Sequence, residues 1–159
     1  MTVAVLGSLA GGNAVLRSGA SAGDVVALAG TVGRAAAGLA LLEAEAAVQS
    51  LAPAQWALVE VQCRPRPPLS AGPLARSAGA TAMLDISDGL VRDGGRLAAA
   101  SGVVLDLDPA TLKPFAEALR PASDLLRADP WSGCWAGERT TGCWPHSRPV
   151  FSCLPDSLR

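Results

Sequence analysis

The chain has 159 residues, half of them hydrophobic, and a formal net charge of −1 at pH 7. This is enough for one medium-sized domain with a core, and the apolar content excludes a chain that is disordered by composition. The neutral balance and the lack of a basic cluster argue against nucleic acid or an acidic membrane as a partner. We see no signal peptide and no apolar run of membrane-spanning length, so we expect a cytoplasmic protein whose four cysteines are thiols.

The first part of the chain alternates short apolar runs with turns. Val3–Gly7 predicts a short strand, and the turn-rich loop that follows it carries an exposed Arg17. Residues 24–30 predict a buried strand. In residues 31–50, apolar side chains recur at helical spacing, which predicts a helix of roughly four turns that packs into the core.

The middle of the chain is rich in proline. We expect residues 51–73 to form a connection, because the prolines between residues 65 and 68 exclude a helix around them. A short helix should then begin near its end and stop at Gly79, and residues 80–85 predict a strand.

The remaining elements continue the alternation. Residues 87–102 predict a helix with Gly102 as its C-cap, Val103–Pro109 predicts a strand, and residues 111–126 predict a helix that is broken at Pro121. Strands that alternate with helices place the fold in the α/β or α+β class.

An acidic cluster lies where the strand at 80–85 meets the following helix. Ser87 or Asp88 can cap that helix, but capping does not account for Asp85, since a carboxylate at the end of an apolar strand is costly unless it is paired or liganded. Two carboxylates and a hydroxyl at a helix N-terminus also suit a site for Mg²⁺ and phosphate. Both interpretations remain open on spacing alone.

The wider sequence around this cluster resembles a known family. Residues 82–103, AMLDISDGLVRDGGRLAAASGV, closely resemble the signature of thiamine-monophosphate kinases, in which Asp-[Ile/Val]-Ser-Asp-Gly-Leu precedes a helix that ends in Ala-Ser-Gly-Val. Residues 15–42 and 64–83 resemble two further segments of the family. The segments follow in the family's order, and the resemblance extends over roughly residues 1–128.

The resemblance implies a two-domain α/β fold shared with aminoimidazole-ribonucleotide synthetase, and transfer of a phosphoryl group from ATP to thiamine phosphate to give thiamine diphosphate. It implies that Asp85 and Asp88 bind Mg²⁺, that Ser87 contacts ATP, and that Arg17 meets the nucleotide phosphates. This agrees with phosphoryl transfer in general, in which metal ions and positioned cations carry most of the catalysis.

The resemblance also divides the chain. Residues 1–20 would be the end strand and loop of an N-terminal ATP-binding domain, residues 21–130 a partial C-terminal domain, and residues 131–159 a tail. The family's first domain supplies most Mg²⁺ ligands and the usual homodimer interface. We expect that domain to be missing here, and this chain alone to have little or no kinase activity.

The tail from residue 131 onward has a different composition, with three of the four tryptophans and the only histidine. A zinc site would need Cys134, Cys143, His146 and Cys153, whose spacing contains no Cys-x-x-Cys pair and does not favour it. The family continues at this point with Gly-Gly-Glu-Asp. Codons read from the last base of the Trp131 codon can give EWVLGGGEDHGLLAA, which indicates a single lost base. Such an out-of-frame tail should be disordered or weakly packed.

Two other interpretations stay open. Another ATP- and Mg²⁺-dependent enzyme of the same superfamily, such as a relative of selenophosphate or formylglycinamidine synthetase, would use a similar acidic site, although the segment at 84–103 matches those enzymes less well. Alternatively, the chain is a non-catalytic fragment whose sheet edge binds a partner.

Overall fold

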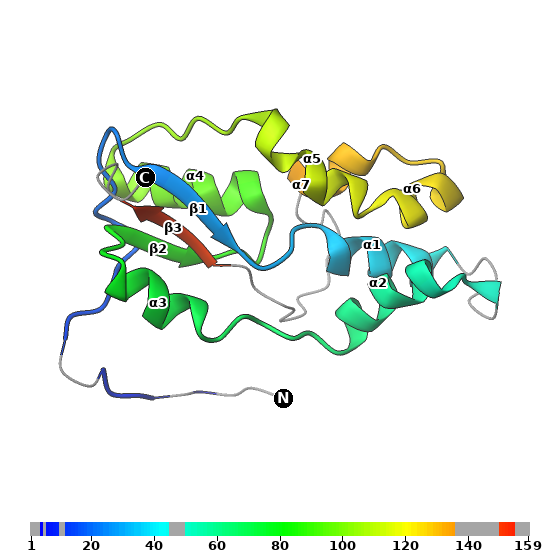
Figure 1. The fold of residues 1–159 in the computed structure, drawn as a ribbon, viewed down its shortest axis with the longest axis horizontal. Coiled ribbons are helices and arrows are strands. Elements are labelled where there is room, and N and C mark those ends of the chain that lie inside the picture. The colour runs from blue at the N-terminus through cyan, green and yellow to red at the C-terminus, as the bar shows by residue number, and fades with distance from the viewer. Residues whose placement is uncertain (1–3, 5, 10–11, 45–49, 136–149, 155–159) are drawn as a thin grey trace.

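The computed structural model describes residues 4, 6–9, 12–44, 50–135 and 150–154. They form a mixed α/β structure in which a small sheet lies beside a group of helices (Figure 1). This confirms the expected fold class. In chain order the elements are β1 (Val25–Ala29), α1 (Arg34–Glu43), α2 (Pro53–Cys63), α3 (Ala71–Ser77), β2 (Ala82–Asp85), α4 (Leu90–Ser101), α5 (Pro109–Glu117), α6 (Arg120–Leu126), α7 (Pro130–Trp135) and β3 (Val150–Leu154).

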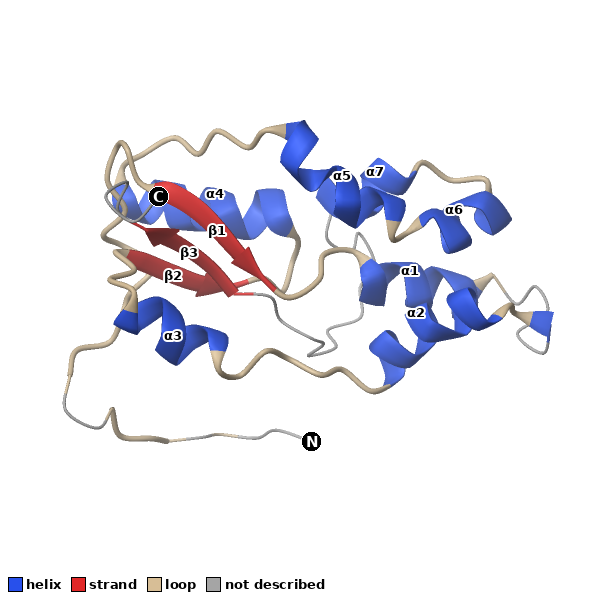
Figure 2. Ribbon diagram, in the orientation of Figure 1, coloured by secondary structure: helices blue, strands red, loops and turns tan. Residues whose placement is uncertain are grey.

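The sheet has the strand order β1-β3-β2, and β3 runs antiparallel to both neighbours. The register places Cys153 of β3 opposite Val26 of β1 on one side and opposite Ala82 of β2 on the other. Helix α4 lies behind the sheet and α3 lies beside β2, while α1, α2, α5, α6 and α7 form a separate layer of helices next to them (Figure 2).

The central strand β3 corrects one expectation from the sequence. The sequence predicts a disordered or weakly packed tail from residue 131, yet Val150–Leu154 forms the middle strand of the sheet and the side chain of Cys153 is fully buried. The backbone N–H and C=O groups of a central strand pair on both sides, and the small side chain of Cys153 tolerates burial there. Residues 136–149 and 155–159 lie outside the described part of the chain.

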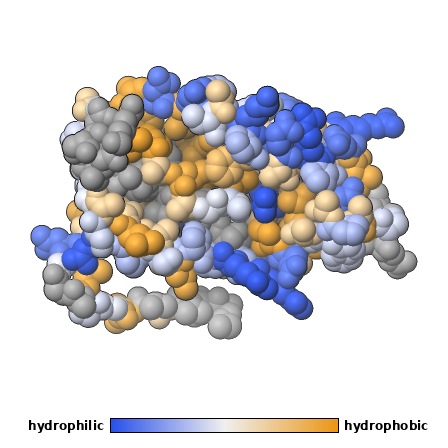
Figure 3. All heavy atoms as spheres, in the orientation of Figure 1, coloured by the Kyte–Doolittle hydropathy of each residue, from blue (hydrophilic) through white to orange (hydrophobic). Residues whose placement is uncertain are grey.

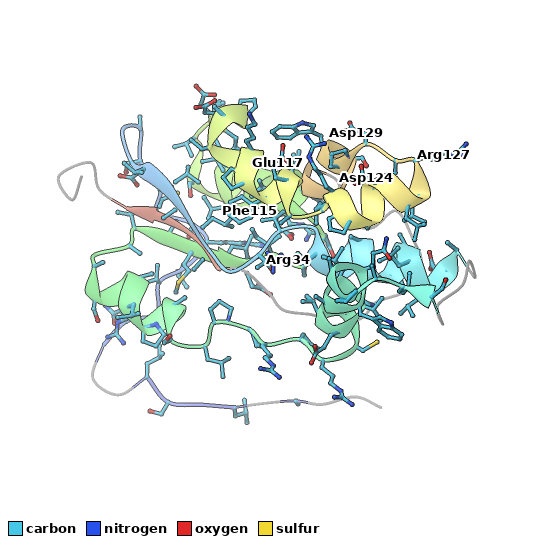
Figure 4. All side chains as sticks on the ribbon, turned by 45° about the vertical axis from the view of Figure 1, so that its right-hand side comes forward. Arg34, Phe115, Glu117, Asp124, Arg127 and Asp129 are labelled. Carbon is cyan, nitrogen blue, oxygen red and sulfur yellow. The ribbon has the colours of Figure 1, made fainter. Side chains whose placement is uncertain are left out.

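Two hydrophobic clusters form the core. The first lies between the sheet and α4 and includes Leu90 and Leu97, which are at most 1% exposed. The second joins α1, α2, α5 and α6 around Leu41. Phe115 and Trp131 pack against both clusters and so connect the sheet to the helical layer; Figure 4 shows Phe115 on α5, above Arg34 at the start of α1.

Helix α2 differs from the expectation that residues 51–73 form a connection throughout. Pro53 stands in the first turn of α2, where a proline removes no helical hydrogen bond, and the helix ends before the prolines at 65–68. Its buried Leu58 and Val59 face α1. The prolines therefore exclude a helix only around themselves.

The strand expected at Val103–Pro109 is also absent as a paired strand. Residues 103–108 precede α5 without ladder pairing, and Pro109 is the first residue of that helix. Val103, Leu105 and Leu107 are nevertheless less exposed than the residues between them, as in a strand with one buried face. Between this segment and β1 lies a cavity of about 940 Å³. Leu28, Leu90 and Phe115 contribute to its apolar lining.

Hydrophilic and apolar residues are distributed unevenly over the surface. Hydrophilic residues gather over the layer of helices on one side of the view, and apolar residues are visible through the middle of the same face (Figure 3). Glu117 ends α5, Asp124 lies on α6, and Arg127 follows α6 at the outer end of the helical layer (Figure 4). The Arg120 guanidinium pairs with Glu117 and lowers the pKa of that carboxyl group.

The contact between α1 and α2 depends on a glycine. A Cβ atom at Gly38 would collide with the carbonyl oxygen of Leu58, which belongs to the backbone and cannot rotate away. We therefore expect Gly38→Ala to lower the free energy of unfolding by about 1–3 kcal/mol, as an overpacked core does. Urea denaturation followed by circular dichroism measures this change.

Gly95 of α4 is the matched control. A Cβ atom there would meet nothing within 4 Å. Gly95→Ala should raise the free energy of unfolding by about 0.5–1 kcal/mol, because alanine loses less backbone entropy in a helix. Equal effects of the two substitutions would show that α1 and α2 do not pack as closely as described.

Candidate functional site

The acidic cluster forms a short loop between β2 and α4. Asp85 is the last residue of β2 and is half-buried, Ser87 is exposed, and the side chain of Asp88 is 38% exposed. Gly89 follows with a φ of 109°, a conformation that side chains other than glycine's rarely adopt. The structure thus brings Asp85, Ser87 and Asp88 together, as the sequence predicted.

The predicted helix cap is different in the structure. Neither Ser87 nor Asp88 caps α4, whose N-cap position is Gly89 with no side-chain hydrogen bond. Instead, Asp93 in the first turn of the helix reaches back to the loop. Its Oδ2 accepts hydrogen bonds from the backbone N–H groups of Ser87 and Asp88, each at 2.7 Å. Asp93 is only 2% exposed, so it determines the loop conformation from inside the fold.

Arg96, one turn further along α4, completes this network. Its Nη1 lies 2.6 Å from Oδ1 of Asp93 and 2.7 Å from Oδ2 of Asp88, so one guanidinium nitrogen joins both carboxylates. The hydrogen bond from Arg96 is the main reason that the pKa of Asp88 lies below its ordinary value, with a smaller contribution from the charge of Arg92. Asp88 is therefore ionised at neutral pH.

Sequence reasoning missed both Asp93 and Arg96. The signal was present, because an acidic residue in the first turn of a helix and an arginine three positions later lie on the same helix face.

The N-terminus of α4 adds a feature that suits an anion. The helix has 12 residues, and no side chain caps its first turn. Backbone N–H groups at such an end carry partial positive charge and favour a phosphate group. The loop therefore combines carboxylates, a hydroxyl group and a helix N-terminus in one place.

Arg17 lies apart from this loop. Its carbonyl oxygen accepts a hydrogen bond from the Ser101 hydroxyl at the far end of α4, and the neighbouring Leu16 accepts one from the N–H of Met83. This places Arg17 beside the first residues of β2, whereas Asp85 ends that strand, roughly 7–10 Å away along the chain. The side chain of Arg17 is exposed.

The residues present fit a magnesium ion that takes some of its ligands from the protein and the others from a substrate and water. Among the described residues, no group of three or more His, Cys, Asp or Glu side chains forms a metal cage. Mg²⁺ commonly binds through one or two carboxylates together with phosphate oxygens and water, and Asp85 and Asp88 match this pattern. Of the zinc ligands considered from the sequence, Cys143 and His146 lie outside the described residues, and Cys153 is buried in the sheet.

None of the helices in the described part of the chain has the length and apolar character of a membrane span.

The two cysteines whose surroundings are described are both free thiols, and Cys63 is exposed. Burial, and to a lesser degree the charge of Asp24, raises the pKa of the Cys153 thiol above its ordinary value.

Comparison with known proteins gives one consistent result. The thiamine-monophosphate kinase of Mycobacterium tuberculosis is 41% identical over 145 residues, which cover 86% of this chain and 39% of that protein. The crystal structure of thiamine-monophosphate kinase from Stenotrophomonas maltophilia K279a superposes with a TM-score of 0.74 at 30% identity, over 91% of this chain and 43% of that one.

A further solved structure, AaThiL complexed with AMPPCP and TMP, superposes with a TM-score of 0.68 at 26% identity, over 91% of this chain and 43% of that one. No family model matches the chain. The chain spans less than half the length of these relatives. The sequence comparison and the structure comparison nonetheless point to the same relatives. The chain belongs to the thiamine-monophosphate kinase family and corresponds to a part of its longer members.

Proposed function

We propose that this chain is a part of an enzyme that transfers a phosphoryl group from ATP to thiamine phosphate. The observation that carries the proposal is the loop from Asp85 to Asp88 in front of α4, where two carboxylates, a hydroxyl group and an uncapped helix N-terminus meet. The structure of the similar protein AaThiL is complexed with AMPPCP, an ATP analogue, and TMP, which supports ATP and thiamine phosphate as the two substrates.

Each residue has a proposed role that follows from its chemistry. Asp85 and Asp88 would hold Mg²⁺, which when bound neutralises the negative charge of the phosphates. Ser87 would donate a hydrogen bond to a phosphate oxygen near the start of α4. Arg17 would meet the nucleotide from the loop beside the start of β2, which requires its exposed side chain to reach toward the end of that strand.

We further propose a cytoplasmic location, a homodimer in the complete protein, and residues 1–20 as the end of a nucleotide-binding domain that precedes residues 21–130. The tail from residue 131 would be an out-of-frame sequence. The chain alone would have little or no kinase activity, because it spans less than half the length of the kinases that it resembles.

Binding of the nucleotide tests the proposal without requiring turnover. In isothermal titration of the chain with AMPPCP and Mg²⁺, we expect Asp85→Asn and Asp88→Asn each to weaken binding about tenfold or more, because a carbonyl oxygen is a poorer ligand for a hard divalent cation than a carboxylate. Titration without Mg²⁺ should show a much smaller difference between the variants.

Asp106→Asn provides the control, since Asp106 is an exposed aspartate on the segment before α5, outside the loop at 85–88. It should bind magnesium and AMPPCP as the unchanged chain does. If the loop variants and the control bind equally well, Asp85 and Asp88 do not hold the metal and the proposed site is wrong.

A further inference from the structure

Arg96 lies beside the proposed metal site, and any role that it has there rests on the proposed function. Its guanidinium lies 2.7 Å from Oδ2 of Asp88, one of the two carboxylates proposed to hold Mg²⁺. The positively charged Arg96 is thus already paired with the carboxylate that a bound Mg²⁺ would need.

The bond between Arg96 and Asp88 is the more exposed half of the network. Both side chains are partly exposed, at 42% and 38%. Ion pairs of this exposure stabilise proteins little, because water solvates the separated charges almost as well. Breaking this pair is therefore a small cost for a divalent cation that binds Asp88.

The bond between Arg96 and Asp93 is different. The carboxylate of Asp93 is 2% exposed and accepts from Arg96 at 2.6 Å, in addition to two backbone N–H groups. Removing a partner from a buried charge is expensive. Arg96 therefore has a fixed anchor at Asp93 and an exchangeable contact at Asp88.

From this geometry we infer that Arg96 is an internal competitor of the divalent cation at Asp88. In the metal-free protein it neutralises Asp88. When a cation binds, Arg96 gives up Asp88, keeps its bond to Asp93, and remains beside the metal as a positive charge. This lowers the affinity of the free protein for the metal, so that the metal binds preferentially together with the nucleotide, whose negative charge offsets that of the guanidinium.

The test measures binding of Mn²⁺, a paramagnetic substitute for Mg²⁺, to the 159-residue chain without nucleotide, by electron paramagnetic resonance. We expect Arg96→Gln to bind Mn²⁺ about three- to tenfold more tightly, because one neighbouring positive charge and one competing ion pair are lost. Arg96→Lys, which keeps the charge, should stay within about twofold of the unchanged chain.

Arg92→Gln is the matched control. Arg92 is on the same helix, its Nε is 3.9 Å from Oδ2 of Asp88, and its side chain is 66% exposed. Its loss should change Mn²⁺ affinity less than about twofold, because a more exposed and more distant charge is better screened. Thermal denaturation of every variant shows whether a change in affinity reflects a change in folding.

The outcomes separate this inference from the proposed function. Tighter binding by Arg96→Gln alone supports the inference. If the unchanged chain binds Mn²⁺ and Arg96→Gln binds equally or more weakly, the inference is overturned while the proposed metal site stands. If neither protein binds Mn²⁺ at millimolar concentration, both the inference and the proposed metal site are overturned.

Discussion

A chain that ends at residue 149 should lose its sheet, and with it most of its cooperative unfolding transition. Every residue of β1 and of β2 is paired with β3, and β1 and β2 are not paired with each other. Without β3 both flanking strands lose their ladder partners, and the core against α4 loses the fully buried Cys153. The expected loss is several kcal/mol, a large part of the stability of an ordinary domain.

Hydrogen exchange at the amides of Val25–Ala29 and Ala82–Asp85 measures this loss, together with thermal denaturation. The matched control is a chain that ends at residue 154, which retains all of β3. The control should keep protected amides in β1 and β2, and the shorter chain should not. Identical melting curves for the two chains would mean that β3 does not hold the sheet together.

The intact chain offers a second measurement of the same strand. Cys153 is buried and its thiol has a raised pKa, whereas Cys63 is exposed. In the folded chain iodoacetamide should modify Cys63 rapidly and Cys153 only after denaturation, because the thiolate is the reactive form. Equal rates at the two cysteines would support the expectation, from sequence alone, of a tail without stable structure.

Replacement of Asp93 should give the largest effect of any single substitution in the acidic loop. We expect Asp93→Ala to lower the free energy of unfolding by about 2–4 kcal/mol, because it leaves two backbone N–H groups and Arg96 without their acceptor. Asp93→Asn should cost less, since its single amide oxygen can still accept from one or both N–H groups.

Urea denaturation compares these variants with Asp106→Ala, which removes an exposed aspartate and should change the free energy of unfolding by less than about 0.5 kcal/mol. Asp93→Ala should also change the shape of the loop, so chemical shifts of Ser87 and Asp88 should move while those of α2 do not. If Asp93→Ala unfolds at the same urea concentration as Asp106→Ala, the hydrogen bonds of the buried Asp93 carboxylate do not stabilise the fold.

Much of the loop was predictable from the sequence because its pattern is local. Asp85, Ser87 and Asp88 fall between an apolar strand and a helix, and chain geometry alone puts them together. Asp93 was missed because it acts back along the chain, from the first turn of the helix to the residues before it. Arg17 was assigned from a resemblance between sequences, which does not show how far apart two segments lie.

The missed elements have different physical causes. Helix α2 begins at Pro53 and lies next to a proline-rich segment. The prolines suggested a connection without a helix, although the first turn of a helix tolerates a proline. Strand β3 depends on partners more than 60 residues away in the sequence, so no local pattern identifies it. The residues at 103–108 have the alternation of a strand, but no neighbouring strand is present in the described residues to pair with them.

The cavity beside β1 separates that strand from the unpaired residues before α5. Its lining comes from both, with Val25, Val26 and Leu28 of β1 on one side and residues 102–108 on the other. Neither this side of β1 nor residues 103–108 has a ladder partner among the described residues, and unpaired backbone edges of this kind are sites at which a further strand can add to a sheet.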